Sequence, residues 1–267
     1  MLELKNIYKT FNPGTINEKR ALNGLNLKLN EGDFVTVIGG NGAGKSTMLN
    51  AVAGTWPVDE GQILIDNIDV TKLSEHKRAT YLGRVFQDPM TGTAATMGIE
   101  ENLALAKRRG KSRLLRSGIT KAEREEYKEL LKILGLGLED RLTSKVGLLS
   151  GGQRQALTLL MATLQKPKLL LLDEHTAALD PGTAEKVLNL TKRIVEEHQL
   201  TCLMITHNMQ SALDLGNRIL MMDSGDIVLD IHEEEKKGLT VEGLLEKFKT
   251  GAGKMLDNDR ILLSGEK

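Results

Sequence analysis

The stretch DFVTVIGGNGAGKSTMLNAVAG, at residues 33–54, decides the fold. It begins at residues 33–38 with a short apolar run rich in β-branched side chains, which predicts a buried strand. Residues 45–53 have the pattern of a helix. The glycine-rich segment between them satisfies the pattern G-x-x-x-x-G-K-[ST] through Gly39, Gly44, Lys45 and Ser46. A strand before the pattern and a helix after it are the context that a phosphate loop requires.

Each residue type in this loop has a chemical reason. Glycines let backbone N–H groups approach phosphates, and the helix N-terminus adds partial positive charge. Lys45 is expected to reach the β- and γ-phosphates, and Ser46 to coordinate Mg²⁺. The alternative is a glycine turn before an ordinary helix. A second glycine-lysine stretch, GAGKM at residues 251–255, has Phe248 and Met255 where the pattern needs glycine and Ser or Thr, so we interpret it as part of a tail.

Length and composition bound the possible functions. The chain has 267 residues, enough for one large domain or two small ones with a hydrophobic core. Lys plus Arg and Asp plus Glu both total 36, which argues against an overall basic field for nucleic acid. The single cysteine, Cys202, excludes a disulfide framework, fits a reducing compartment and is interpreted as a core residue. No signal peptide or membrane-spanning run is recognisable, so a cytoplasmic chain is expected.

Strand and helix patterns alternate along the rest of the chain. A hairpin is predicted around Asp66 and Asn67, and a capping box pairs Thr120 with Glu123 before a helix. From residue 88 to 147 helical patterns dominate. Further strands are predicted at residues 168–172, 201–205, 218–222 and 227–230, with helices at 183–197 and 209–215. This alternation predicts an α/β fold with a mostly parallel sheet covered on both faces.

Polar residues follow three apolar strands. Asp173 and Glu174 come directly after four leucines, and in open α/β sheets ligands bind at the carboxyl ends of strands. Asp173 is expected to hold Mg²⁺, and Glu174 to orient or deprotonate the attacking water. His207 follows the strand at 201–205 and is a candidate contact for the γ-phosphate. Gln87 follows Val85 and Phe86 and is a candidate sensor of metal or water. Solvated helix starts or structural side chains are the alternatives.

A second anion site is predicted at residues 148–156, LLSGGQRQA. Ser150 can cap a helix, and Gly151 and Gly152 can present backbone N–H groups beside it. This site has no lysine of its own, which makes sense if it completes a site whose lysine lies elsewhere. Two chains arranged head to tail with two-fold symmetry would let each LSGGQ cover the ATP bound to the other chain's phosphate loop.

These motifs, in this order and spacing, resemble the ATP-binding subunits of ABC transporters over residues 2–230. The resemblance implies a P-loop NTPase core with a mixed, mostly parallel sheet, an antiparallel β subdomain and an inserted helical subdomain. The implied boundaries are 1–87 and 148–235 for the core, 88–147 for the helical subdomain and 236–267 for a C-terminal helical tail. The resemblance adds nucleotide-binding roles for Phe11, Asn41, Gly42, Ala43, Thr47, Gln153 and Asp180. Phe11 would stack on adenine, with Tyr8 as the alternative, and Asp180 would mark a loop that acts across the dimer.

The resemblance also implies a function. ATP and Mg²⁺ would bring two copies, or one copy and a homologous subunit, together, and hydrolysis would release them. Transmembrane permease subunits would receive the motion near residues 88–96, at the inner face of the cell membrane. Uptake of a small solute such as an amino acid, with a solute-binding protein and without nucleic acid, is the expected role. The alternative is a soluble ATPase that serves a scaffold, as in iron–sulfur cluster assembly.

Other classes fit less well, and two features stay open. A GTPase would leave LSGGQ unused, and the NKxD tetrad that reads guanine is absent from this sequence. Relatives that act on ribosomes usually carry two motif sets, whereas this chain has one. DNA-repair relatives separate their motifs with long coiled coils, which this sequence does not show. The basic segment at residues 107–116 is either a solvated face or a surface attracted to anionic lipid or a permease loop. His175 stands where proline often follows the glutamate in the family, and little consequence is expected.

Overall fold

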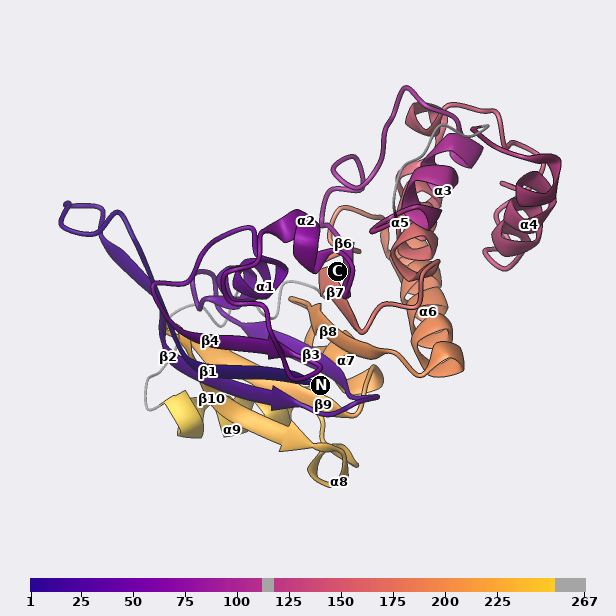
Figure 1. The fold of residues 1–267 in the computed structure, drawn as a ribbon. Helices are drawn as coiled ribbons and strands as arrows, with labels where there is room; N and C mark the ends of the chain where they lie inside the picture. The colour runs from indigo at the N-terminus through magenta and orange to yellow at the C-terminus, as the bar shows by residue number, and fades with distance from the viewer. Residues whose placement is uncertain (112–117, 253–267) are drawn as a thin grey trace. The chain divides into compact units, whose positions relative to one another are not determined.

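The computed structural model describes residues 1–111 and 118–252 (Figure 1). The chain divides into two compact units. Unit 1 contains Met1–Arg78 and the chain from Gln199 onward, and unit 2 contains Ala79–His198. The subdomain boundaries inferred from the sequence stay predictions, and residues 253–267 of the predicted tail lie outside the described residues. Each unit is described separately below.

Unit 1 contains an antiparallel sheet of four strands in the order β2-β1-β4-β5. These are β1 (Leu2–Phe11), β2 (Lys19–Leu29), β4 (Glu60–Ile65) and β5 (Ile68–Asp69). Asp66 and Asn67 form the β4–β5 turn with φ of 54° and 63°, which confirms the predicted hairpin. Figure 1 shows the indigo β1–β2 hairpin projecting beyond the rest of unit 1.

The second set of strands in unit 1 is ordered β10-β9-β3-β8. It consists of β3 (Phe34–Gly39), β8 (Thr201–Ile205), β9 (Arg218–Asp223) and β10 (Asp226–His232). The central strand β3 is buried along its whole length and runs parallel to both β8 and β9, whereas β10 is antiparallel to β9. A continuous apolar run is the pattern of a parallel strand covered on both faces. The strands predicted at 201–205, 218–222 and 227–230 are therefore confirmed.

The described part of unit 1 also contains five helices, α1 (Lys45–Ala53), α2 (Glu75–Arg78), α7 (Met209–Asp214), α8 (Glu233–Lys236) and α9 (Val241–Ala252). Of these, α1, α7, α8 and α9 contact this sheet. One core cluster joins α7 and α9 to the sheet through Ile38, Met209, Ala212, Ile219, Met221, Ile231, Leu244 and Phe248. Burial of each Ile, Leu, Met or Phe side chain stabilises the fold by about 1.5–3 kcal/mol relative to exposure. The predicted C-terminal helix thus contributes to the core of unit 1.

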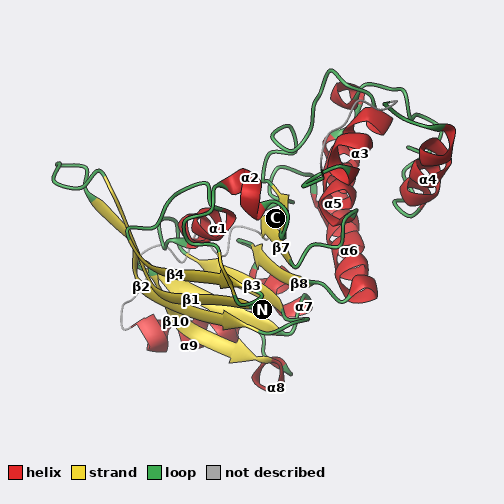
Figure 2. Cartoon of the chain, viewed as in Figure 1, coloured by secondary structure: helices red, strands yellow, loops and turns green. Residues whose placement is uncertain are grey.

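Unit 2 combines two parallel strands with helices. The strands are β6 (Leu82–Val85) and β7 (Leu169–Asp173), and the helices are α3 (Ile99–Lys107), α4 (Lys121–Lys132), α5 (Gly151–Thr163) and α6 (Pro181–His198), with a 3₁₀ turn at Val146–Leu148. Figure 2 shows α3, α5 and α6 as neighbouring red helices. The predicted capping box of α4 is present, because Thr120 Oγ1 accepts from Glu123 N and Thr120 N donates to Glu123 Oε2.

Within residues 1–111 and 118–252, no helix has both the length and the apolar character that a membrane crossing needs.

Candidate functional site

The phosphate-loop segment joins β3 to α1 in unit 1. Gly39 has φ of 152°, and a Cβ on it would lie 2.2 Å from Met222 O. Gly44 has φ of 101°, and a Cβ there would lie 2.6 Å from Ala21 O. Residues with a Cβ rarely adopt these backbone angles, and a Cβ would not fit in the space at either position. The two motif glycines are therefore required by the fold of the loop itself.

Lys45 opens α1 with its side chain turned into the loop. Lys45 Nζ donates to Gly39 O at 2.8 Å and to Gly40 O at 3.0 Å, and the residue is only 5% exposed. The next residue, Ser46, is exposed in the first helical turn, and Thr47 is half-buried. The first N–H groups of a helix lack intrahelical partners and attract anions. The segment therefore has the geometry of a phosphate cradle, with Asn41 and Gly42 exposed at its outer edge.

The turn between β9 and β10 supports the loop from behind. Gly225 N donates to Ala43 O at 3.0 Å, and Gly225 O accepts from Asn23 N at 3.1 Å. Gly225 has φ of 85°, and a Cβ on it would lie 2.8 Å from Ala21 O. No pattern in the sequence predicts this support, because the contact joins residues far apart in the chain.

His207 lies at the same edge of the sheet as the loop. Strands β3 and β8 are parallel neighbours, Val37 pairs with Ile205, and Thr206 N donates to Val37 O at 3.1 Å. Both strands therefore deliver their following residues at one edge. His207 is exposed there. Unit 1 thus brings together the predicted phosphate loop and the predicted γ-phosphate contact.

Phe11 ends β1 and is half-buried. Its ring meets the ring of Trp56 edge to face, with centroids 5.0 Å apart, and Lys9 Nζ lies 5.6 Å from the Phe11 centroid. Tyr8 instead covers Gly24, since a Cβ on that glycine would lie 2.8 Å from the Tyr8 hydroxyl oxygen. Phe11 is thus supported from one side by Trp56, a residue that the sequence interpretation did not use.

In unit 2, the predicted metal and water residues leave two paired strands at the same end. Strands β6 and β7 are parallel with Val85 opposite Leu172, so Gln87 and Asp173–Glu174 follow the strands at one edge. Gln87 is exposed, whereas Asp173 and Glu174 are half-buried. Glu174 has φ of 45°, an uncommon angle for a residue with a side chain. Such angles concentrate at functional sites, where the surrounding structure enforces them.

Two side chains near these residues have no motif of their own. Arg84 on β6 places Nη2 3.9 Å from Asp173 Oδ2 and its guanidinium 4.5 Å from the centre of the Phe86 ring. Gln155 on α5 is fully buried and donates from Nε2 to Phe86 O at 3.1 Å. The helix that carries LSGGQ is thereby bonded to the backbone beside Gln87. Spacing in the sequence gives no indication of either contact.

The LSGGQ motif forms the N-terminus of α5 as predicted. Ser150 Oγ accepts from Gln153 N at 3.3 Å, and Gln153 Oε1 accepts from Ser150 N at 3.2 Å. This is a complete capping box. In the described residues, Ser150 caps the N–H of Gln153, which leaves the N–H groups of Gly151 and Gly152 at the helix start for an anion.

The two glycines of the motif also have a packing reason. A Cβ on Gly151 would lie 3.2 Å from Leu179 Cδ2, and one on Gly152 would lie 2.1 Å from Thr183 Cγ2. Asp180 lies in the same segment and caps α6, because Asp180 Oδ1 accepts from Thr183 N at 3.0 Å. Hydrogen bonds from Thr183 lower the pKa of Asp180. LSGGQ and Asp180 are therefore adjacent within one chain.

His175 is buried directly after Glu174. Its Nε2 lies 3.0 Å from Thr191 Oγ1, and that hydroxyl donates to Val187 O at 2.8 Å. The Thr191 proton is thus already engaged, which makes His175 Nε2–H the donor of the pair. Burial lowers the pKa of His175 to about 4, so the imidazole is neutral at pH 7. His175 therefore connects the segment after β7 to α6 by a hydrogen bond to Thr191.

The oxygen donors fit magnesium in type. Ser46 offers an exposed hydroxyl and Asp173 a half-buried carboxylate, both hard oxygen ligands. Across residues 1–111 and 118–252, no group of three or more His, Cys, Asp or Glu side chains is arranged to hold a metal ion. Magnesium is commonly bound through one or two carboxylates together with substrate phosphates. Each of these two oxygens is therefore of the type that a metal arriving with a nucleotide prefers.

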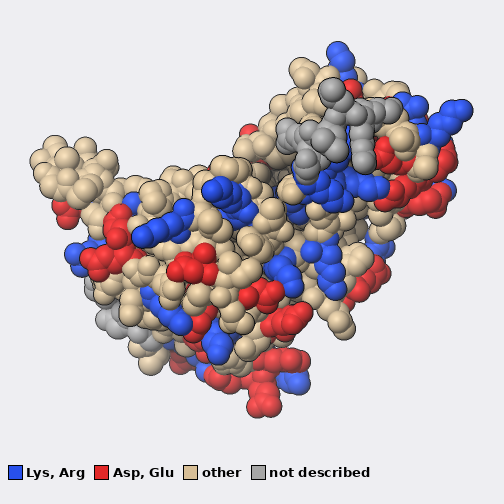
Figure 3. Space-filling view, in the orientation of Figure 1, with Lys and Arg blue, Asp and Glu red and all other residues tan. Residues whose placement is uncertain are grey.

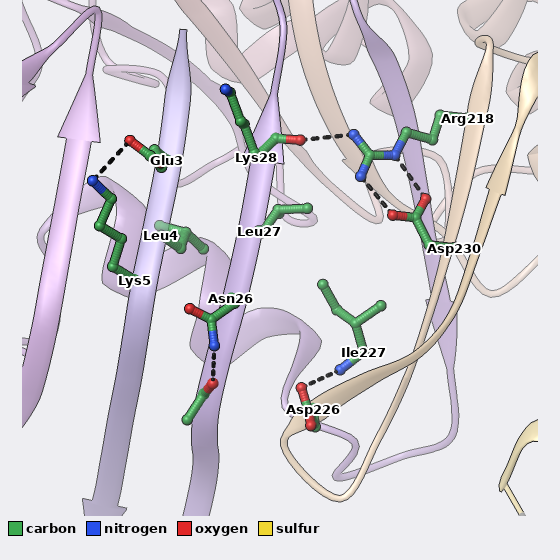
Figure 4. A pocket seen from close by; sticks show the side chains of 11 residues that line it. Glu3, Leu4, Lys5, Asn26, Leu27, Lys28, Arg218, Asp226, Ile227 and Asp230 are labelled. Carbon is green, nitrogen blue, oxygen red and sulfur yellow. Dashed lines mark hydrogen bonds and ion pairs between the residues drawn. The ribbon is translucent and has the colours of Figure 1, made fainter.

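A separate cavity of about 440 Å³ in unit 1 contains none of the predicted site residues (Figure 4). Arg218 donates to both carboxylate oxygens of Asp230, at 2.7 and 2.6 Å, and to Lys28 O at 2.7 Å. The bond to Asp230 raises the pKa of Arg218. Lys5 pairs with Glu3 at 3.2 Å on the opposite wall. Three basic and three acidic side chains line the cavity, so neither sign of charge dominates it.

The basic segment is described only up to residue 111, and residues 112–117 lie outside the described residues. Lys107 pairs with Glu126, and Arg108 with Glu123 at 3.2 Å, both on α4. Arg109 donates to Ala162 O at 3.3 Å, and its burial lowers its pKa. In the view of Figure 3, Lys and Arg side chains are interspersed with Asp and Glu. Three basic side chains are thus engaged within unit 2, and the lipid interpretation stays untested.

Known proteins are similar to this chain. A family model described as ABC transporter matches residues 22–177. The chain is 45% identical over 249 residues to a tyrosine transport ATP-binding protein of Clostridioides difficile, covering 93% of this chain and 98% of that protein. It is 34% identical over 239 residues to a phosphonates import ATP-binding protein of Treponema denticola, covering 86% and 89%. A solved dimeric ATP-binding cassette, bound to ADP and Pi in a post-hydrolysis state, is 33% identical with a TM-score of 0.74, covering 87% and 99%.

Proposed function

Because the chain belongs to the ABC transporter family as one of its ATP-binding, ATP-hydrolysing subunits, we propose that it dimerises around two ATP molecules and drives a membrane permease for the uptake of a small solute. The observation that carries this proposal is the cradle at Gly39–Ser46, with the Lys45 ammonium held inside it by two backbone carbonyls. The same chain carries a capped second anion site, LSGGQ, without a lysine.

The residues take the following proposed roles. Lys45 and the loop N–H groups bind the β- and γ-phosphates, and Ser46 holds Mg²⁺, which neutralises phosphate charge when bound. Asp173 is the proposed carboxylate ligand of Mg²⁺, and Gln87 is a proposed sensor of metal or water. Glu174 orients or deprotonates the attacking water, and His207 contacts the γ-phosphate. Phe11, backed by Trp56, stacks on adenine.

Dimerisation gives LSGGQ its proposed partner. Ser150 and the N–H groups of Gly151 and Gly152 would bind the γ-phosphate of ATP held by a second copy or a homologous subunit. An isologous two-fold arrangement uses both anion sites of both chains. ATP, which spans both chains, stabilises the closed state more than ADP does, and only this difference in affinity can drive the cycle. Asp180, which borders the motif, would lie near the interface.

Coupling to a permease is proposed at residues 88–96, which follow Gln87. Met90 is exposed in this segment, Arg154 of α5 contacts Met90 Sδ, and Leu148 is exposed just before the LSGGQ motif. An apolar group bonded to the helix of the second anion site is suited to transmit a change in nucleotide state to a partner. The chain would act at the inner face of the membrane, with a solute-binding protein on the other side.

An amino acid is the proposed cargo, supported by the tyrosine transport protein that is 45% identical over nearly the full length of both chains. The phosphonates import relative is less similar, at 34%. Cargo selectivity would reside in the permease and the solute-binding protein. Recovery of the tagged chain from native membranes with a permease would support this proposal. Recovery with a soluble iron–sulfur scaffold would replace it with the alternative.

The decisive experiment measures the molar mass of the Glu174→Gln variant in the presence of ATP and of ADP, by size exclusion with light scattering. Loss of the carboxylate should slow turnover by roughly 10²- to 10⁴-fold and preserve ATP binding. We expect a dimer in ATP and a monomer in ADP. The matched control, Glu174→Gln with Lys45→Ala, should stay monomeric in both. A Glu174→Gln monomer in both nucleotides at high protein concentration would contradict dimerisation by this chain alone.

A further inference from the structure

A second lysine lies against the phosphate-loop segment without belonging to its motif. Lys19 is the first residue of β2 and pairs in register with Phe11, the last residue of β1. A Cβ placed on Gly42 would lie 3.1 Å from Lys19 Nζ. The Lys19 ammonium therefore lies directly over the outer edge of the loop, whereas the Lys45 ammonium is held inside it.

Within the described part of the chain, no carboxylate pairs with this ammonium. Among residues 1–111 and 118–252, Lys19 makes no ion pair, although its side chain is exposed and adjacent to Glu18 in sequence. Glu18 Oε2 instead accepts from Gly14 N at 2.7 Å, toward the tip of the hairpin. Arg20, the next residue, donates from Nη1 to Asn23 Oδ1 at 3.3 Å. The positive charge of Lys19 is thus left facing an anion-binding loop.

The register indicates which part of a nucleotide this charge would meet. Residues directly opposite each other in an antiparallel pair project from the same face of the sheet. Lys19 therefore shares a face with Phe11, the proposed adenine platform, and reaches Gly42, part of the proposed phosphate cradle. An ammonium placed between a base platform and a phosphate loop lies on the side of the phosphates nearest the base.

We propose that Lys19 is a further nucleotide-binding residue, which contacts the α- or β-phosphate from the outer side of the loop. This inference rests on the proposed use of the loop for ATP. ATP and ADP share these two phosphates, so Lys19 would strengthen the binding of both by the same factor. Its contribution would fall with ionic strength, because the side chain is exposed to solvent.

The test is calorimetric titration of ADP and ATP into the full chain carrying Lys19→Gln, at 50 and 300 mM NaCl. We expect roughly 3- to 10-fold weaker binding of both nucleotides at low salt, the size of one partly exposed charge-assisted contact, and a smaller loss at high salt. Lys19→Arg should retain most of the affinity. Arg20→Gln is the matched control and should bind like the unsubstituted chain.

The outcomes separate this inference from the proposed function. Unchanged affinity in Lys19→Gln, with strong loss in Lys45→Gln, would overturn the role of Lys19 alone. A loss for ATP with none for ADP would also overturn it, because the contact would then be to the γ-phosphate. Unchanged affinity in Lys45→Gln would instead contradict the use of this loop for ATP.

Discussion

Replacement of His175 by glutamine should remove a pH dependence of stability that burial creates. His175 is 2% exposed, and its imidazole Nε2 donates to Thr191 Oγ1 at 3.0 Å. Burial lowers its pKa from 6.5 to about 4. The folded state thus resists protonation in a range where the unfolded chain accepts a proton. Glutamine is neutral at every pH used and can still donate a hydrogen bond.

The sign and size follow from linkage. Above pH 6.5 the imidazole is neutral in both states, and its full contribution to the free energy of unfolding is present. As the pH falls from 6.5 towards 4, the unfolded state binds the proton, and stability is lost at about 1.4 kcal/mol per pH unit. The total loss below pH 4 is about 3 kcal/mol, and about 2.5 kcal/mol of it is reached at pH 4.5.

The assay is urea unfolding of the unsubstituted chain and of His175→Gln at pH 7.5 and pH 4.5. Carboxylates titrate in the same range, so the informative quantity is the difference between the two proteins at each pH. That difference should change by about 2.5 kcal/mol in favour of the variant on going to pH 4.5. His198→Gln, at an exposed histidine on α6, is the matched control. Equal pH slopes in His175→Gln and the unsubstituted chain would refute the buried neutral imidazole.

Two further predictions test contacts in unit 2. Gly152→Ala should lower the free energy of unfolding by about 1–3 kcal/mol, because its Cβ would lie 2.1 Å from Thr183 Cγ2. In thermal unfolding, adding Thr183→Ser should partly restore the midpoint, and the control Gly118→Ala should have no effect. An unchanged midpoint for Gly152→Ala would contradict the contact. Arg84→Met and Asp173→Asn should show a coupling energy of about 1 kcal/mol in a double-mutant cycle of urea unfolding. The reason is that the charged atoms of Arg84 and Asp173 lie 3.9 Å apart and are largely buried. Additive effects of the two substitutions would mean that the ion pair contributes nothing to stability.

Buried runs of apolar residues were the most predictable part of the fold. The strand predicted at 201–205 coincides with β8, and that at 168–172 differs from β7 by one residue at each end. A strand buried on both faces has an uninterrupted run of apolar residues, which can be recognised without knowing which strands pair with it. Strands β1 and β2 were not recognised individually. Register shifts interrupt their pairing after Leu4, Ile7 and Lys9, so the alternation of apolar and polar residues is broken.

The residues of the candidate site also fall into a group that the sequence predicts and a group that it does not. Lys45, Ser46 and Ser150 were found because a local backbone geometry, a loop or a cap, demands their residue types at fixed spacing. Arg84 and Lys19 were missed because their significance comes from strand pairing. Arg84 faces Asp173 across β6 and β7, and Lys19 reaches Gly42 from another strand. No spacing rule in a single sequence predicts which lysine or arginine a register brings to a loop.

LSGGQ has the additional difficulty that two physical requirements select the same residues. An anion site needs a capped helix start with small residues, and Ser150, Gly151 and Gly152 provide it. Close packing of the start of α5 against the segment from Leu179 to Thr183 also needs small residues, whether or not a nucleotide binds. Loss of ATPase activity in Gly152→Ala would therefore not by itself establish a role in nucleotide binding. Glu174→Gln avoids this ambiguity because its dimerisation readout depends on whether ATP or ADP is present, and a packing defect would affect both nucleotides alike.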